Sequence, residues 1–348
     1  MFRYALERWQ AEPFQVVVFH KGDLDPATSA FVNSLNQAAE AAANRANVHA
    51  VPVRVDKEIP EEFRDLWAHA KTEDLPWAVA LFSNAPSVAW AGKPTLENAR
   101  QLLDSPARTK IANHIMGGAS TVWVLLESGD KQKDDQARTL LMNALSKAEK
   151  SLELPEILPE DRERYLSAGG PELKISFPIL SVSRSDPQEQ FFIQMMCRTE
   201  DNLPAGIPVA FPIFGQGRLL GAFYGDTLSA DEIEAACAFL TGMCSCQVKE
   251  MYPGTDLLFT AGWHRFLNGM IEGEPVLPDL VGTARPEVSP APLEPVVRKK
   301  PPVERRLPDP SPPASPVLRN VLVAAGIGIF VIAAASLLLS RKRRWGSS

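Results

Sequence analysis

Short apolar runs alternate with segments of helical spacing over the first hundred residues of the chain. Runs rich in Val, Ala and Phe predict strands at residues 14–20, 48–56, 75–83 and 87–92, and a turn signal at residues 84–86 separates the last two. Helical spacing of apolar side chains predicts helices at residues 26–46 and 60–73, and a further helix that begins at Thr95. The predicted order is β-α-β-α-β-β-α.

The same order of elements is predicted a second time in the next part of the chain. Strands are expected at residues 121–128, 173–183, 207–214 and 218–225, and helices at residues 134–152, 187–197 and 230–241. Individual positions also correspond, because Leu75-Pro76 matches Ile207-Pro208. The chain is therefore predicted to hold two tandem copies of one α/β unit, residues 1–118 and residues 119–270.

The second copy resembles the thioredoxin-like superfamily in its distal half. The residues that carry this resemblance are Gly206-Ile207-Pro208, an apolar strand, a Gly-containing turn, a strand that ends at Gly225 and a helix led by Ser229. The resemblance implies a thioredoxin-like fold in each copy, with a cis-proline at the start of the third core strand. Pro76 and Pro208 hold that position in the two copies, and a cis X-Pro bond costs only about 0.5–1 kcal/mol relative to the trans bond.

The sequence departs from this family where the family keeps its redox Cys-x-x-Cys motif. That motif implies two thiols at the turn from the first strand into the first helix, where the helix N-terminus lowers the thiol pKa. The first copy has Leu24-Asp25-Pro26-Ala27 at this place, so Leu24 and Ala27 stand where the family has cysteines. The second copy has no cysteine near residues 131–134 either. Dithiol exchange therefore has no nucleophile at either usual position.

Cys244 and Cys246 are the candidate thiols that remain. If the preceding helix stops at Gly242, both sulfurs lie in a loop and can act as a redox pair or as half of a metal site. If the helix continues, the two side chains point about 200° apart and Cys244 packs into an apolar row. His264 is the nearby histidine, and no second Cys or His pair follows at ligand spacing. Structural packing, a redox pair and a metal site all remain open.

Other catalytic and cofactor signatures do not appear in the sequence. The histidines are scattered, and neither a phosphate-binding loop nor a Ser-centred elbow is present, so we expect no cofactor and no bound metal. The modest negative charge and a pI near 5.5 do not favour nucleic acid as a partner.

The last part of the chain changes character twice. Residues 275–316 hold 13 prolines among 42 residues, which favours an extended stalk over a packed core, and we assign this stalk to residues 271–316. Val321–Leu339 then runs for 19 residues without a charge, which matches a hydrocarbon core about 30 Å thick. We expect a transmembrane helix at residues 317–340 and a basic tail at residues 341–348.

These features predict a single-pass, C-terminally anchored membrane protein whose bulk lies in the cytoplasm. The N-terminus has no apolar stretch of the length that a secretory signal needs. With no thiol pair at the family positions, we expect a redox-inactive interaction or scaffolding module that meets a protein partner at the membrane. The alternatives are a thiol-disulfide oxidoreductase or redox sensor that uses Cys244 and Cys246, and a metal-binding module at the same cysteines.

Overall fold

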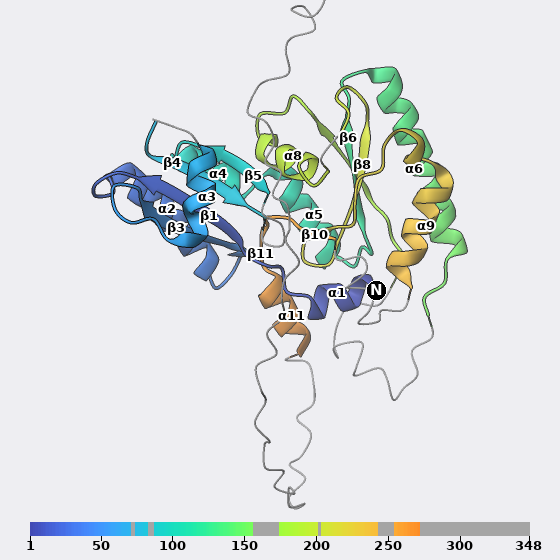
Figure 1. Ribbon diagram of the computed structural model, residues 1–348. Coiled ribbons are helices and arrows are strands. Elements are labelled where there is room, and N and C mark those ends of the chain that lie inside the picture. Colours follow the sequence, from blue (N-terminus) through green and yellow to red (C-terminus); the bar gives the residue numbers. More distant parts are fainter. Residues whose placement is uncertain (71–73, 83–86, 156–173, 201–202, 243–253, 272–348) are drawn as a thin grey trace, which may run out of the picture. The chain divides into compact units, whose positions relative to one another are not determined.

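The computed structural model describes residues 1–70, 74–82, 87–155, 174–200, 203–242 and 254–271 (Figure 1). The chain divides into two compact units, Met1–Glu294 and Pro295–Ser348, and all described residues belong to the first unit. The structure is a mixed α/β arrangement around two main sheets.

The first sheet has the strand order β3-β1-β4-β5. Its strands are β1 (Phe14–His20), β3 (Val48–Arg54), β4 (Trp77–Leu81) and β5 (Val88–Gly92). β1 pairs with β3 in parallel and with β4 antiparallel, and β4 pairs antiparallel with β5. β1 is buried along almost its whole length, because helices cover both faces of this central strand.

Three helices cover the first sheet, namely α2 (Pro26–Glu40), α3 (Glu61–Ala70) and α4 (Leu96–Leu103). α2 and α4 contact each other, and their apolar side chains share a cluster with Val16 and Val18 of β1. α3 lies on the other face, where Phe63 packs with Val17 and Phe19. Alternate residues of β1 therefore supply two separate apolar layers.

The second sheet has the strand order β10-β9-β8-β6-β7 and repeats these directions. Its strands are β6 (Val122–Glu127), β7 (Ile179–Ser183), β8 (Val209–Phe214), β9 (Arg218–Leu219) and β10 (Thr255–Asp256). β6 pairs with β7 in parallel and with β8 antiparallel, and β8 pairs antiparallel with β9. The two sheets thus share one strand order and one set of strand directions.

The helices of the second half are α6 (Lys131–Ser151), α8 (Gln190–Cys197) and α9 (Ala230–Thr241), with a 3-10 turn η1 at Gly225–Thr227. α6 and α9 lie side by side against one face of the sheet (Figure 1). α8 packs its Phe and Met side chains on the other face, in the same apolar cluster as Phe14 and Phe31 of the first half. One continuous core therefore joins the two halves.

A terminal segment of each half also packs against the other half. α1 (Phe2–Arg8) packs against β8, and the side-chain amide of Gln216 donates to the carbonyl of Leu6 over 2.9 Å. In return, β11 (Thr260–Ala261) pairs antiparallel with β2 (Arg45–Ala46) of the first half, and α11 (Trp263–Ile271) follows. This exchange of ends means that neither half buries its core by itself.

Arg108 fixes this exchange from the linking helix α5 (Pro106–Met116). Its guanidinium is 1% exposed and donates to the carbonyl oxygens of Leu102 and Leu258 at 2.7 and 3.0 Å. The guanidinium also lies 5.4 Å above the ring of Phe191. Burial lowers the pKa of Arg108 to about 10, so the side chain stays charged at neutral pH. A buried cation with this many partners orders the junction of the two halves.

Asn47 connects the same segments through its side-chain amide. Its Nδ2 donates to the carbonyls of Glu12 and Leu257, both at 3.1 Å, and its Oδ1 accepts from the backbone N–H of Phe259 at 2.8 Å. One asparagine thereby holds the N-terminal segment, the start of β3 and the C-terminal segment together.

Several elements differ in length from the sequence prediction. α2 ends at Glu40 instead of continuing to residue 46, because Arg45 and Ala46 pair with β11. β7 begins at Ile179, five residues after the described segment starts at Lys174. Before it, Ser176 bonds to Ser120 and the Phe177 N–H bonds to Glu149. In both places tertiary contacts override local propensity.

The described residues contain no helix long and apolar enough to cross a bilayer. The predicted anchor, Val321–Leu339, lies outside the described residues, as do the basic tail and residues 272–316 of the predicted stalk. Ile271, the first residue assigned to the stalk, is the last residue of α11.

Candidate functional site

The turn from β1 into α2 is the place where the resemblance implies the first redox pair. Leu24 is half-buried and Ala27 is exposed, and Asp25 between them is the N-cap of α2. Its Oδ1 accepts from the N–H groups of Ala27 and Thr28, both at 2.9 Å, and its Oδ2 accepts from the Thr28 hydroxyl at 2.6 Å. The Thr28 hydroxyl and N–H lower the pKa of Asp25. A carboxylate therefore already occupies the helix terminus that would stabilise a thiolate.

The corresponding turn of the second half is closed in the same way. Asp130 is the N-cap of α6 and accepts from the N–H groups of Gln132 and Lys133 at 3.0 and 3.3 Å. These bonds lower the pKa of Asp130, with the Lys133 N–H as the largest cause. Asp134 is buried and accepts from Ser128 and Gly129 of the same loop. Both turns thus hold carboxylates in place of thiols.

The two prolines named by the resemblance differ in their peptide bonds. The Leu75–Pro76 bond is cis, and the register of β1 with β4 places Pro76 opposite His20. Ile207–Pro208 is not among the cis bonds of the described residues, so the expected cis bond at Pro208 is absent there. Gly206, with φ at 73°, supplies the sharp turn before β8, and the trans bond is the lower-energy form.

The thiols of the two described cysteines have low reactivity. Cys237 is fully buried beside Trp123, and burial raises the pKa of its thiol to about 12. Cys197 is half-buried at the end of α8, and burial raises its pKa as well. Since the thiolate is the reactive form, both side chains are chemically quiet at neutral pH.

The two candidate thiols of the sequence lie beyond the described part of α9. The helix ends at Thr241 with Gly242 as its C-cap, which favours the reading in which the helix stops there. Cys244 and Cys246 themselves lie outside the described residues. Among the residues that are described, no group of three or more His, Cys, Asp and Glu side chains is arranged to hold a metal ion.

A groove of about 340 Å³ is built from both halves. Its walls come from the segment after α1, from β2, and from β11 and α11. They include Gln10, Pro13, Arg45, Trp263 and His264. A groove of this volume lies within the range of binding sites, about 300–1,000 Å³. We name it the junction groove.

Arg45 gives the junction groove its electrostatic character. Its side chain is exposed on β2, and it has no ion-pair partner in the part of the chain that is described. The other full charge on the wall, Glu7, is paired with Arg3 on the same helix. The groove therefore offers a cation within a lining that also includes apolar residues such as Pro13 and Leu267.

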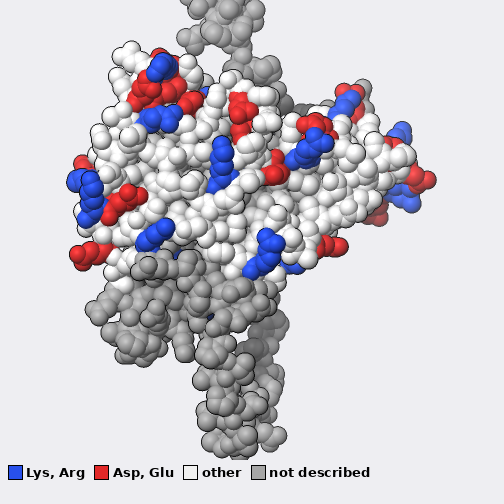
Figure 2. Space-filling model, turned by 180° about the vertical axis from the view of Figure 1, so that it is seen from behind, with Lys and Arg blue, Asp and Glu red and all other residues white. Residues whose placement is uncertain are grey.

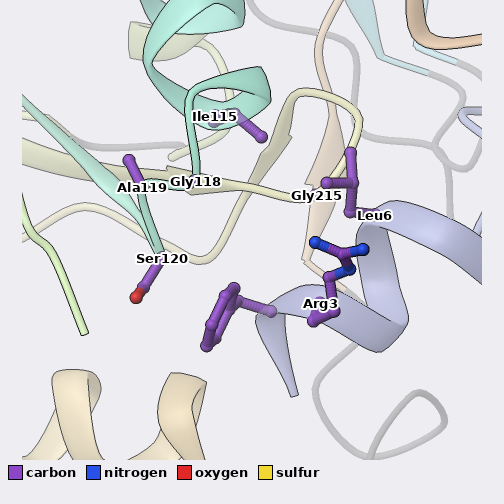
Figure 3. A pocket seen from close by; sticks show the side chains of 8 residues that line it. Arg3, Leu6, Ile115, Gly118, Ala119, Ser120 and Gly215 are labelled. Carbon is purple, nitrogen blue, oxygen red and sulfur yellow. The ribbon is translucent and has the colours of Figure 1, made fainter. Parts of the chain in front are cut away.

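A second cavity, beneath α1, is too small for a ligand. It holds about 10 Å³, enough for one water molecule. Figure 3 shows Arg3 and Leu6 on one side of it, with Ile115 and Ser120 on the other. The residues around this cavity pack α1 on the second half.

Sequence reasoning did not find the junction groove. Its wall residues lie far apart in the chain, and short strands such as β2 and β11 carry no periodic signal.

Comparisons with known proteins give no family and only weak structural similarity. No protein family model matches the chain, and no curated protein matches it. Among solved structures, the first two thioredoxin domains of Saccharomyces cerevisiae Eps1p share 9% identity, covering 68% of this chain and 94% of that chain, with a TM-score of 0.22. The first two thioredoxin domains of Naumovozyma dairenensis Eps1p share 10% identity, covering 70% and 97%, with a TM-score of 0.19. With TM-scores this low, the description of two repeated α/β units rests on the strand order and pairing described above.

Proposed function

We propose that this chain is a redox-inactive tandem thioredoxin-like protein that acts as an interaction module on a membrane tether. The observation that carries the proposal is the pair of N-cap carboxylates, Asp25 and Asp130, at the turns where the resemblance implies thiols. Each carboxylate uses the helix terminus for structure, so neither turn is equipped for thiol chemistry. On this proposal the copies span residues 1–118 and 119–270.

The binding surface in this proposal is the junction groove. Its occupant is a segment of a partner protein that brings an acidic side chain next to apolar ones, because Arg45 shares the groove lining with apolar residues such as Pro13 and Leu267. A site that is built from both halves also gives a reason for keeping two copies that have no redox turn.

The membrane part of the proposal rests on the sequence. Val321–Leu339 is the proposed anchor in the bilayer, the Pro-rich stalk is the spacer, and the bulk of the chain faces the cytoplasm. Nucleic acid is not a partner in this proposal. Figure 2 supports that choice, because Lys and Arg side chains on that face are interspersed with Asp and Glu instead of forming a basic patch.

Peptide selection tests the groove directly. A display library of random ten-residue peptides is panned against the full chain in mild detergent, and enriched peptides are titrated by fluorescence anisotropy. We expect enriched peptides to carry Asp or Glu beside apolar residues, and Arg45→Glu to weaken their binding by about tenfold or more.

The matched control is Lys150→Glu, a charge reversal at an exposed position of α6 that does not line the groove. It should leave peptide binding unchanged. The proposal is wrong if no peptides are enriched, or if both charge reversals have the same effect.

A further inference from the structure

The outer edge of β7 offers backbone groups that no described element uses. Trp123 pairs with Ile179, and its N–H donates to the carbonyl of Pro178 at 2.9 Å. In a parallel ladder, this register turns the backbone groups of Ile179, Ser181 and Ser183 away from β6. The Ser183 carbonyl accepts from the Asp186 N–H, whereas the N–H groups of all three residues have no partner in the described structure.

The equivalent edge of the first half is closed. Phe14 pairs with Val48 and donates to the Asn47 carbonyl, so Val48, Ala50 and Pro52 of β3 face outward in the same register. The Asn36 side chain of α2 bonds both outward groups of Ala50, at 2.8 and 3.1 Å. Pro52 has no N–H to offer. Side-chain cover and proline are two of the devices by which proteins protect edge strands.

Neither device is present at the matching positions of the second half. When the two sheets are aligned on the matched prolines Pro76 and Pro208, Ile179 corresponds to Ala50 and Ser181 corresponds to Pro52. Asn36 is the eleventh residue of α2, and the eleventh residue of α6 is Leu141, which is fully buried in the apolar cluster and has no polar group for the edge. Among the described residues, one sheet is therefore protected at its edge, and the other leaves outward N–H groups unpaired at the corresponding place.

The chemistry of the open edge defines its occupant. Main-chain donors and acceptors at alternate positions are matched by another extended main chain. The side chains of Ile179 and Leu180 are half-buried and point to opposite faces of the sheet, so they offer apolar contact on both sides of an added strand.

We propose that β7 binds an extended, β-branched segment of a partner protein by strand addition, which lengthens the second sheet by one strand. This inference goes beyond the proposed function, because β7 contributes no residue to the junction groove. The two proposals are therefore independent, and the failure of one does not affect the other.

The test is a peptide selection with a built-in counter-selection. A display library of random eight-residue peptides is panned against the full chain, and binders that are retained by the Ser183→Pro variant are removed. Ser183→Pro removes an outward N–H group at the last residue of β7 that takes no part in the ladder with β6, and thermal melting checks that the variant still folds.

We expect selected peptides to be rich in Val, Ile and Thr. Ser181→Pro and Ser183→Pro should each weaken their binding by about tenfold or more, whereas Ser183→Thr, which keeps the N–H, should change it by less than about twofold. N-methylation of one alternate set of peptide amides should abolish binding, and methylation of the other set should not. Arg45→Glu should have no effect.

Three results would overturn the inference. The first is binding that survives both sets of N-methylation, because main-chain pairing would then be unnecessary. The second is an absence of peptides that discriminate against Ser183→Pro. The third is dimerisation of the full chain that Ser183→Pro abolishes without any peptide binding, which would assign the edge to a second copy instead.

Discussion

Arg218 and Asp256 form an ion pair that is almost completely withdrawn from water. Nη2 and Nε of the guanidinium lie 2.6 and 2.9 Å from Oδ2 and Oδ1 of the carboxylate, and the two side chains are 5% and 3% exposed. Oδ2 also accepts from the backbone N–H of Glu12 at 3.1 Å, and the guanidinium lies 5.4 Å above the ring of Trp9. The pair therefore joins β9 and β10 to the segment that follows α1.

Removal of one partner from this pair should be costly. Asp256→Ala leaves the Arg218 charge buried without its carboxylate, and we expect the free energy of unfolding to fall by about 3–5 kcal/mol. Urea unfolding of the full chain in detergent measures it. The control is Glu58→Ala, which breaks an exposed pair with Arg64 and should cost less than about 1 kcal/mol. Equal losses in the two variants would contradict the structural role of the buried pair.

Gly217 provides a test of the contact between β9 and the C-terminal segment. Its φ is 96°, and a Cβ placed there would lie 2.4 Å from the ring of Phe259. Gly129 has a similar φ of 91° with no atom within 4 Å of such a Cβ, so it isolates the backbone cost. We expect Gly129→Ala to destabilise the fold by about 1 kcal/mol and Gly217→Ala by at least about 1–3 kcal/mol more. Similar melting temperatures for the two variants would show that the Phe259 contact is absent.

Asp56 gives the prediction for pH. The side chain of Arg54 and then the N–H of Gly22 lower the pKa of Asp56 from 3.8 to about 2. A carboxyl whose pKa is lower in the folded state stabilises the fold above pH 3.8, and this contribution disappears as the pH falls through about 2. The parent chain should therefore be more stable than Asp56→Asn at pH 7, and the difference should shrink between pH 4 and pH 2. A difference that stays constant with pH would contradict this.

Cys237 should resist modification in the folded protein. With its thiol buried and its pKa raised to about 12, N-ethylmaleimide at pH 8 should label it only after denaturation. Mass spectrometry of native and urea-treated samples measures the labelled fraction, and Cys197 should label more slowly than a cysteine in a free peptide. Rapid labelling of Cys237 in the native protein would show that this core opens readily.

The pattern of the sequence was enough to predict most of the two sheets. Long apolar runs such as residues 14–20 became buried central strands, and N-cap residues such as Thr95 and Ser229 began helices where expected. The spacing of apolar residues shows which face of a segment is buried. Corresponding segments of the two halves bury the same faces. The absence of thiols at the two helix starts could likewise be read from the sequence.

The exchange of ends and the junction groove could not be predicted in this way. α1, β2 and β11 are short, and each gains its structure from contacts with distant residues, such as Thr260 with Ala46. Arg108 looks like a surface residue in the sequence, yet it is buried, because carbonyls from two distant segments meet at its guanidinium. The unpaired edge of β7 became visible only when the register with β6 showed which backbone groups face outward.

The most direct test of the central claim is a thiol–disulfide exchange assay on the full chain in detergent. The reduced protein is mixed with a fluorogenic glutathione disulfide and compared with the Cys244→Ser/Cys246→Ser variant. Carboxylates cap both helix starts, and in our account the chain acts by binding. The two proteins should therefore show the same slow exchange rate, which is that of an ordinary exposed thiol. A fast exchange rate that disappears in the variant would contradict a redox-inactive protein and establish the two cysteines as its active site.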